Sequence, residues 1–475
     1  MAEIGNDIFF ATLTDLNRRL KAREFSAVEL ARAFCERLEK LGPRYNALAL
    51  SLRDSALNRA RDVDGEIKRG RFRGPLQGVP FGVKDLLSVA VKPTTWGARP
   101  YANQRFAYDA TVVKKLIGAG APLIGKLSMV ELAGAGGYRY ASASLTGPTL
   151  NPWDVTRWSG GSSSGSAAAV AAGLVPFAIG SETSGSILTP CAYCGVTGLR
   201  PTYGLVSRYG AMAVSWTMDN IGPICRSAED CGYALREMAG DDSQDPSSAG
   251  KSFYYTPQLA RKLSDLRVGF APVDAAERAD ASARPAFVAA IEAIRGLGVK
   301  MVETTLPELP YAPVANTIIS AEASAAFEPL IESGKVEQLA DERQIAGLRA
   351  GLEIAARDYL KAMRIRGLMR AELKKLFMQV DVLVSPSRFG VAPGVGEALG
   401  QPSQPNPLPK SRGLRDLLVA GNLAGLPALS LPCGFAGGLP VAIQLVGRAF
   451  TENTLIALGA AFQGVTDWHR RRPPA

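Results

Sequence analysis

The sequence predicts an α/β fold, in which a single large domain is built on a mixed, twisted β-sheet core flanked by α-helices. Short apolar runs bounded by Gly and Pro alternate with longer segments of helical periodicity, as α/β proteins require. The chain also shows no internal repeat and no clean linker. We therefore assign residues 1–475 to one domain.

The predicted elements follow in order from the N-terminus. Residues 1–65 are expected to be mainly helical, and Ser26 and Glu29 have the spacing of a capping box at the start of the second helix. The core segment, 75–235, contains a short β-rich run that leads directly to Lys84. The remainder is expected to form a strand–helix–strand unit at 265–306, helices over 319–380, a strand at 381–386, and a final hairpin and helix.

One segment has no periodicity. Residues 386–412 are rich in Gly and Pro and include PSQPNPLP. Long aperiodic loops in compact domains often act as lids, so we expect this segment to be a mobile loop at the rim of a pocket.

Composition excludes several kinds of chemistry. The chain has a single histidine, His469, in a basic C-terminal tail. Ser-His-Asp and Cys-His mechanisms and two-histidine metal motifs are therefore excluded. We expect no metal and no cofactor. The net charge of +10 comes from dispersed arginines without a recognisable nucleic-acid-reading element, so no nucleic-acid partner is expected.

The cysteine content and the apolar runs indicate where the protein works. Six cysteines are spread irregularly, and the one CxxC, Cys191 and Cys194, lacks the context of a redox or zinc site. No export signal and no apolar run of membrane-spanning length are evident. We expect free thiols, no membrane partner and a cytoplasmic location.

The segment 158–190, WSGGSSSGSAAAVAAGLVPFAIGSETSGSILTP, is the most informative part of the sequence. Alone, GGSSSGS has the composition of a flexible linker. The small apolar run after it and the second turn, SETSGS, favour close backbone packing instead. A phosphate-binding loop is disfavoured because neither GxxxxGK[ST] nor GxGxxG spacing is present.

Together, the motifs of the chain resemble the amidase signature family of serine hydrolases. The resemblance rests on this segment and on four further stretches in the same order: GVPFGVKD, CGVTGLRPTYGLVSRYG, DNIGPICRSAED and GLPVAIQLVGR. It covers nearly the whole chain, and only 265–380 is generic. It implies the amidase signature fold and hydrolysis of an amide-like bond.

The resemblance also implies a catalytic triad. Lys84 matches the family's lysine, Ser162 matches the serine that follows a cis peptide bond, and Ser186 matches the nucleophile. A lysine acts as a base only when it is neutral, so Lys84 must be buried where desolvation lowers its pKa from about 10.4. Ser162 would pass the proton of Ser186 to Lys84, and water would hydrolyse the resulting acyl-enzyme.

The loop that carries the nucleophile has a second predicted role. Acyl transfer builds negative charge on a carbonyl oxygen, which backbone N–H groups must stabilise. Small side chains leave those groups accessible. We therefore predict an oxyanion hole formed by Thr183, Ser184, Gly185 and Ser186.

The sequence departs from the family pattern at Glu182, Ser184 and Leu188, where relatives commonly carry Asp, Gly and Arg. A leucine two residues after the nucleophile indicates an apolar corner, which disfavours an acidic substrate such as glutamine. We therefore predict a neutral, partly aromatic amide, ester or carbamate as substrate. The candidate pocket residues are Met129, Ala133, Tyr138, Tyr140, Leu188 and Trp216.

Two alternatives stay open. The first is the glutamine-hydrolysing subunit of a transfer-RNA amidotransferase, which belongs to the same family and works inside a complex. The second is a non-catalytic binding protein on the same fold. The main prediction instead implies a small-molecule substrate, no nucleic-acid or membrane partner, and a monomer or homodimer. Glutaminase activity with copurifying partners would favour the first alternative, and inertness to serine-directed probes would favour the second.

Overall fold

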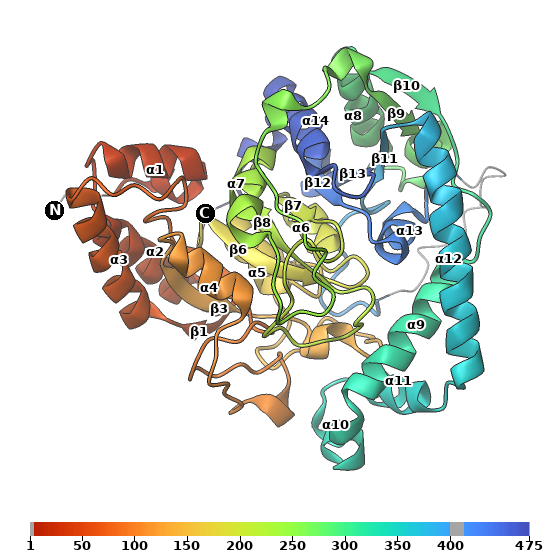
Figure 1. Ribbon diagram of the computed structural model, residues 1–475, viewed down its shortest axis with the longest axis horizontal. Helices are drawn as coiled ribbons and strands as arrows, with labels where there is room; N and C mark the ends of the chain where they lie inside the picture. The colour runs from red at the N-terminus through yellow and green to blue at the C-terminus, as the bar shows by residue number, and fades with distance from the viewer. Residues whose placement is uncertain (1–3, 400–412, 475) are drawn as a thin grey trace.

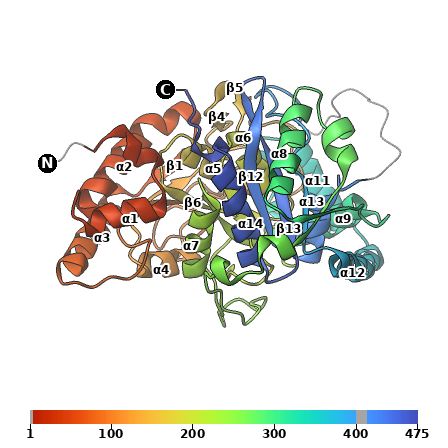
Figure 2. The same cartoon turned by 90° about the horizontal axis from the view of Figure 1, so that it is seen from above.

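A large mixed β-sheet runs through the molecule (Figures 1 and 2). The computed structural model describes residues 4–399 and 413–474. Within these residues, eleven strands pair in the order β1-β3-β2-β6-β8-β7-β12-β13-β11-β9-β10. The strands of this sheet are β1 (Leu48–Ser51), β2 (Phe81–Lys84), β3 (Leu123–Leu127), β6 (Phe177–Glu182), β7 (Thr197–Arg200), β8 (Asn220–Cys225), β9 (Arg267–Phe270), β10 (Lys300–Glu303), β11 (Val382–Pro386), β12 (Ala428–Ala436) and β13 (Leu439–Gly447).

Parallel and antiparallel pairs coexist in the sheet. Strand β2 lies parallel to both β3 and β6, whereas β6 pairs with β8 in the antiparallel sense. A separate antiparallel pair is formed by β4 (Leu150–Asn151) and β5 (Asp154–Trp158). The predicted single α/β domain with a mixed sheet is therefore confirmed.

Helices cover the sheet, and further helices lie at both ends of the molecule. Figures 1 and 2 place α1 to α3 at one end of the molecule and α9 to α12 at the other. None of the helices in the described ranges combines the length and apolar character needed to cross a membrane. The helices are α1 (Leu13–Lys21), α2 (Ala27–Leu41), α3 (Arg53–Lys68), α4 (Thr111–Gly118), α5 (Ser164–Ala171), α6 (Leu188–Cys194), α7 (Ala228–Met238), α8 (Arg284–Gly296), α9 (Tyr311–Ala326), α10 (Glu328–Glu332), α11 (Glu342–Leu352), α12 (Ala356–Gln379), α13 (Leu417–Ala424) and α14 (Glu452–Val465).

Local sequence explains where helix α2 begins. Helix α2 begins after Ser26, whose side chain accepts a hydrogen bond from the N–H of Glu29 while the Glu29 carboxylate accepts one from Ser26. This is the predicted capping box, and it satisfies N–H groups that the first helical turn leaves without partners.

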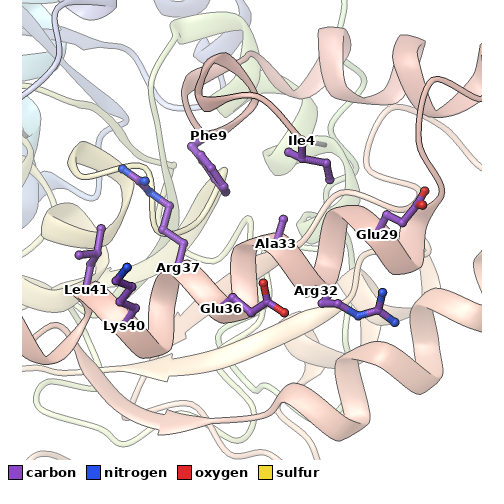
Figure 3. Close-up of a pocket in the computed structure, with 9 residues that line it drawn as sticks. All are labelled: Ile4, Phe9, Glu29, Arg32, Ala33, Glu36, Arg37, Lys40 and Leu41. Atoms are coloured by element: carbon purple, nitrogen blue, oxygen red, sulfur yellow. The ribbon is translucent and has the colours of Figure 1, made fainter. Parts of the chain in front are cut away.

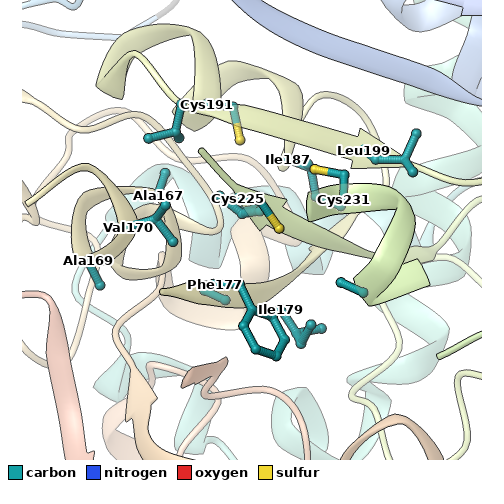
Figure 4. Packing of buried hydrophobic residues seen from close by; sticks show 14 of the residues in the cluster. Ala167, Ala169, Val170, Phe177, Ile179, Ile187, Cys191, Leu199, Cys225 and Cys231 are labelled. Carbon is teal, nitrogen blue, oxygen red and sulfur yellow. The ribbon is translucent and has the colours of Figure 1, made fainter. Parts of the chain in front are cut away.

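The centre of the core is built from small and branched side chains. All residues of α5 are buried, and Ala167 and Val170 of this helix pack near Phe177 and Ile179 of β6 (Figure 4). Small residues allow α5 to approach the neighbouring backbone: a Cβ at Gly165 would lie 2.6 Å from the backbone nitrogen of Ser128. The Gly/Ser/Ala segment is thus packed core and does not form a flexible linker.

The sequence-based elements differ from the structure in two places. The N-terminal helical region is interrupted by β1, which forms the edge of the sheet against β3. The predicted loop at 386–412 falls only partly within the described residues, because 400–412 lie outside them. Its first part packs against β5, where the N–H of Trp158 donates to Pro393 O and the N–H of Val395 donates to Thr156 O.

C-terminal residues pack against the N-terminal segment. The buried guanidinium of Arg226, after β8, donates to the backbone oxygens of His469 (3.2 Å) and Arg471 (2.7 Å). The guanidinium groups of Arg226 and Arg472 lie 5.1 and 4.6 Å from the ring centroid of Phe10. Cation–π contacts and hydrogen bonds therefore join the two ends of the described chain.

Candidate active site

Lys84 ends strand β2 in the interior of the protein and is fully buried. Its Nζ donates to Ser162 Oγ at 2.7 Å and to Ser181 Oγ at 3.0 Å. Burial lowers the pKa of Lys84 to about 7, although the nearby carboxylates of Asp219 and Glu182 act in the opposite direction. Because burial disfavours the charged amine, Lys84 meets the physical requirement for a base near neutral pH.

Ser162 lies in the turn between β5 and α5. The peptide bond between Gly161 and Ser162 is cis, as the family resemblance implies. The next residue ties this turn to the second Ser/Gly turn, because the N–H of Ser163 donates to the carbonyl oxygen of Ser186 at 3.1 Å. The structure thus brings the segments of Lys84, Ser162 and Ser186 together, although they lie far apart in the sequence.

The loop that carries Ser186 connects β6 to α6 and is half-buried at Ser186. Gly185 has a φ of +90°, a conformation that favours glycine. In the part of the chain that the structure describes, the N–H groups of Ser184, Gly185 and Ser186 donate no hydrogen bond to another protein group. These donors are therefore available to a ligand.

The buried carboxylate of Glu182 fixes the start of α6. One oxygen accepts hydrogen bonds from the N–H groups of Ile187 (2.8 Å) and Leu188 (2.9 Å). The other accepts from Arg200 Nη1 (2.7 Å) and Asn422 Nδ2 (3.0 Å). Glu182 and Arg200 are both fully buried, so the loop after β6 is attached to the core by a desolvated ion pair.

A cavity of about 210 Å³ adjoins this loop. Ser181 and Thr183 line it together with Trp216, Asp219, Arg208 and Asp245. Ser181 therefore contacts the Lys84 amine and also borders the cavity. Of the residues predicted to line a substrate pocket, Trp216 is in this lining, with its side chain half-exposed.

The structure places the other predicted pocket residues elsewhere. Met129 and Leu188 are buried in two separate hydrophobic clusters, and Leu188 packs with residues of α13. The ring of Tyr138 packs edge-on against Trp158, with 6.1 Å between the centroids. Ala133 is partly buried in a short turn, and Tyr140 is exposed. None of these residues borders the cavity beside Thr183.

Three polar residues of the site were not predicted from the sequence: Ser181, Asp219 and Arg200. Ser181 and Asp219 occur inside motifs that carry the family resemblance, but a motif does not show which side chain turns toward Lys84. Arg200 lies at the end of β7, and only the pairing of strands brings it to Glu182.

Two other features of the structure are a groove along α2 and a set of buried cysteines. A groove of about 420 Å³ runs along α2 and is bordered by Phe9, Arg37 and Leu41 (Figure 3), and it contains none of the predicted site residues. The six cysteines are buried free thiols, and burial raises the pKa of Cys191 well above its usual range. Cys191 and Cys194 therefore lack the lowered thiol pKa of a reactive redox pair.

Comparison with known proteins identifies the family of this chain. The family model described as Amidase matches residues 29–456. The chain belongs to the amidase family. This amidase is thus a hydrolase that acts on carbon–nitrogen bonds.

Its similarity to individual amidases extends over nearly the whole chain. It is 38% identical to a glutamyl-tRNA(Gln) amidotransferase subunit of Chloroflexus aurantiacus, over 98% of this chain and 99% of that protein. Its structure matches the peptide amidase of Stenotrophomonas maltophilia with a TM-score of 0.82 and 31% identity, covering 98% of each chain. It matches the corresponding glutamyl-tRNA(Gln) amidotransferase subunit of Thermotoga maritima with a TM-score of 0.79 and 28% identity, covering 98% of this chain and 97% of that chain.

These similarities correct the predicted partners. The sequence-based expectation is a small-molecule substrate, no nucleic-acid partner and a monomer or homodimer. Relatives that are 37–38% identical over nearly their full length are instead named for glutamyl-tRNA(Gln) and as one subunit of an amidotransferase. The expectation is therefore wrong. The expectation of no nucleic-acid partner rests on the lack of an RNA-reading element within this chain. In a complex, such an element can lie in another subunit.

Proposed function

We propose that this amidase is the amide-hydrolysing subunit of a transfer-RNA amidotransferase and that it releases ammonia from glutamine. The identity of 38% to a glutamyl-tRNA(Gln) amidotransferase subunit, over 98% of the chain, supports the substrate and the complex. The contact of 2.7 Å between the buried Lys84 amine and Ser162 Oγ supports the mechanism and is the observation on which it rests. We also propose a cytoplasmic location, where transfer RNA is used.

In the proposed mechanism, Ser186 Oγ attacks the carboxamide carbon of the substrate. The proton of the Ser186 hydroxyl passes to Ser162 while the proton of Ser162 passes to the neutral amine of Lys84. The carbon–nitrogen bond then breaks, and the proton held by Lys84 returns through Ser162 to the departing nitrogen, which leaves as ammonia. Water attacks the acyl-enzyme by the same relay, giving a carboxylic acid and restoring Ser186.

We further propose that the loop after β6 stabilises the negative charge of the tetrahedral intermediate. The N–H groups of Ser184, Gly185 and Ser186 support this role because they donate no hydrogen bond to other groups within the described part of the chain. Thr183 begins the same loop, and its backbone belongs to the proposed oxyanion hole. Removing one such donor commonly lowers the turnover of a hydrolase by about 10²–10³-fold.

We propose glutamine, and not a neutral aryl amide, as the substrate. Leu188 is the residue that disfavours glutamine in the sequence, but its side chain is buried in a hydrophobic cluster with residues of α13. A side chain in that position contributes nothing to the polarity of the cavity beside Thr183. Arg208, Asp219 and Asp245 give this cavity charged walls, and Trp216 gives it an aromatic rim. Apolar side chains such as Leu86, Met212 and Ile221 also line this cavity, so the preference for glutamine rests on the similarity to the amidotransferase subunits.

The test is to measure ammonia release from glutamine by the purified protein, with a p-nitroanilide and an aryl carbamate assayed in parallel. We expect hydrolysis of glutamine, its loss in Ser186→Ala, and its retention in Ser55→Ala, which removes an exposed hydroxyl of helix α3. Hydrolysis of the anilide or carbamate without any glutaminase activity, also after addition of the companion subunits and transfer RNA, would overturn the substrate. Glutaminase activity that survives Ser186→Ala would overturn the mechanism.

A further inference from the structure

The cavity beside the loop of Ser186 has a half-buried carboxylate that the mechanism does not use. Asp219 lies directly before β8 and is part of the cavity wall. Its Oδ1 accepts a hydrogen bond from Thr183 Oγ1 at 2.6 Å. Its Oδ2 accepts from the N–H groups of Val214 (2.8 Å) and Ser215 (2.9 Å). The carboxylate therefore joins the start of the proposed oxyanion loop to a different segment of the chain.

Asp219 lines the same cavity as Ser181, whose hydroxyl accepts a hydrogen bond from the Lys84 amine. The carboxylates of Asp219 and Glu182 both favour the charged form of the Lys84 amine, and Arg208 is the cation that acts on Asp219. Burial raises the pKa of Asp219, while its hydrogen bonds to Thr183, Val214 and Ser215 lower it. A single carboxylate is thus connected to the oxyanion loop by a hydrogen bond and to the base by its charge.

From this geometry we propose that Asp219 is a positioning residue, which orients the oxyanion loop through the Thr183 hydroxyl and stabilises the protonated amine of Lys84. The inference rests on the proposed role of Ser186 as nucleophile and is independent of the identity of the substrate. It assigns Thr183 a function that its side chain performs, in addition to the backbone role already proposed.

The position of Thr183 in the loop explains why one hydrogen bond has this effect. The loop leaves β6 at Glu182 and enters α6 at Leu188. Its far end is held by the bonds from Ile187 and Leu188 to Glu182. At its near end the Thr183 side chain is held by Asp219. Loss of this second attachment would let the N–H groups of Ser184 and Gly185 turn away from the reacting oxygen, and donors of this kind act only when their orientation is fixed in advance.

A fluorophosphonate probe tests this without a substrate. Ser186 Oγ forms a bond to the phosphorus of the probe, the phosphorus–fluorine bond breaks, fluoride leaves, and the serine proton passes to Lys84. The rate of labelling therefore depends on the nucleophile, the base and the N–H groups that bind the phosphonyl oxygen. We would measure this rate from pH 5 to pH 9 for the full chain.

Four variants separate the two effects of Asp219. We expect Thr183→Val to slow labelling about tenfold at high pH, because it removes the hydroxyl that orients the loop. The acid limb, which is the fall of the labelling rate as the pH decreases, should not move, because this variant removes no charge. Thr183→Ser keeps the hydroxyl and should restore the rate. Asp219→Asn should move the acid limb to lower pH, because an ammonium without its nearby carboxylate loses its proton more easily. The double variant of Thr183→Val and Asp219→Asn should be no slower at high pH than the slower single variant.

The matched control is Thr111→Val. Thr111 Oγ1 donates to Asp242 Oδ2 at 2.6 Å, which is the same pairing and the same distance, and Asp242 is not among the groups that act on Lys84 or Asp219. Its labelling rate should equal that of the unmodified chain. The proposal is overturned if Thr183→Val labels at the unmodified rate, if Thr183→Ser is as slow as Thr183→Val, or if the acid limb of Asp219→Asn does not move. Absence of labelling in the unmodified chain would overturn both this inference and Ser186 as nucleophile, whereas normal labelling without glutaminase activity would overturn the proposed substrate alone.

Discussion

The ion pair between Glu182 and Arg200 predicts a large loss of stability when its charge is removed. Both side chains are fully buried, and their closest atoms lie 2.7 Å apart. Glu182→Gln keeps the size of the side chain but leaves the guanidinium without a counter-charge. The NH₂ group of the new glutamine also faces two of the four N–H groups that donate hydrogen bonds to Glu182.

The expected magnitude follows from these contacts. Breaking a buried ion pair by removing one partner commonly costs about 3–5 kcal/mol. Arg200 keeps its hydrogen bonds to the carbonyl oxygen of Leu426, which places this variant near the lower end of that range. We therefore expect Glu182→Gln to lower the free energy of unfolding by about 3 kcal/mol, which corresponds to roughly a hundredfold change in the folding equilibrium.

Urea unfolding followed by tryptophan fluorescence measures this loss. The control is Glu452→Gln, a buried glutamate that accepts from Thr202 and has no cationic partner within the described residues. It should lose only about 1 kcal/mol. The double variant of Glu182→Gln and Arg200→Met should be more stable than Glu182→Gln alone, because it removes the unpaired charge. If Glu182→Gln were no less stable than Glu452→Gln, the ion pair would not anchor the loop as described.

The same structure makes three further predictions. The value of kcat/KM should rise about tenfold from pH 6 to pH 8, because the neutral fraction of Lys84 grows as the pH passes its pKa of about 7, and a flat profile would exclude a lysine base. Gly165→Ala should lower the free energy of unfolding by about 1–3 kcal/mol, since its Cβ would lie 2.6 Å from the backbone nitrogen of Ser128. The control is Gly367→Ala in α12, whose Cβ would meet no atom within 4 Å, and this variant should be as stable as the unmodified protein. Equal free energies of unfolding for the two variants would contradict the packing at Gly165. The buried cysteines should react with a thiol reagent only after unfolding in urea, and rapid modification of Cys191 in the native protein would contradict its burial.

Local patterns predicted the elements that depend on nearby residues. The capping box of Ser26 and Glu29, the strand that ends at Lys84, and the hairpin of β12 and β13 are all present. Strand β1 was not predicted, because LALS has no strong strand signal of its own. It becomes a strand through its pairing with β3, which comes much later in the sequence, and such long-range pairing outweighs local propensity.

The site shows the same division. The family motifs indicate Lys84 and Ser162, and the structure places these side chains in contact. Of the predicted pocket residues, Met129 and Leu188 are buried in hydrophobic clusters, because proximity in sequence to a functional loop does not determine which way a side chain points. Leu188 begins helix α6, and the helix turns this side chain into the hydrophobic cluster beside α13. Asp219 and Arg200 were missed for the complementary reason, since strand order alone brings them to the loop after β6.

The contact between the chain ends has a consequence for synthesis on the ribosome. Arg226 and Phe10 acquire their partners near the C-terminus only when residues 469–472 have been made. The N–H of Leu13, at the start of α1, already donates to Asp230 of α7, so the contacts of residues 469–472 add to a junction that earlier residues form. The contacts of residues 469–472 are therefore the last of the described contacts around Phe10 and Arg226 to be made.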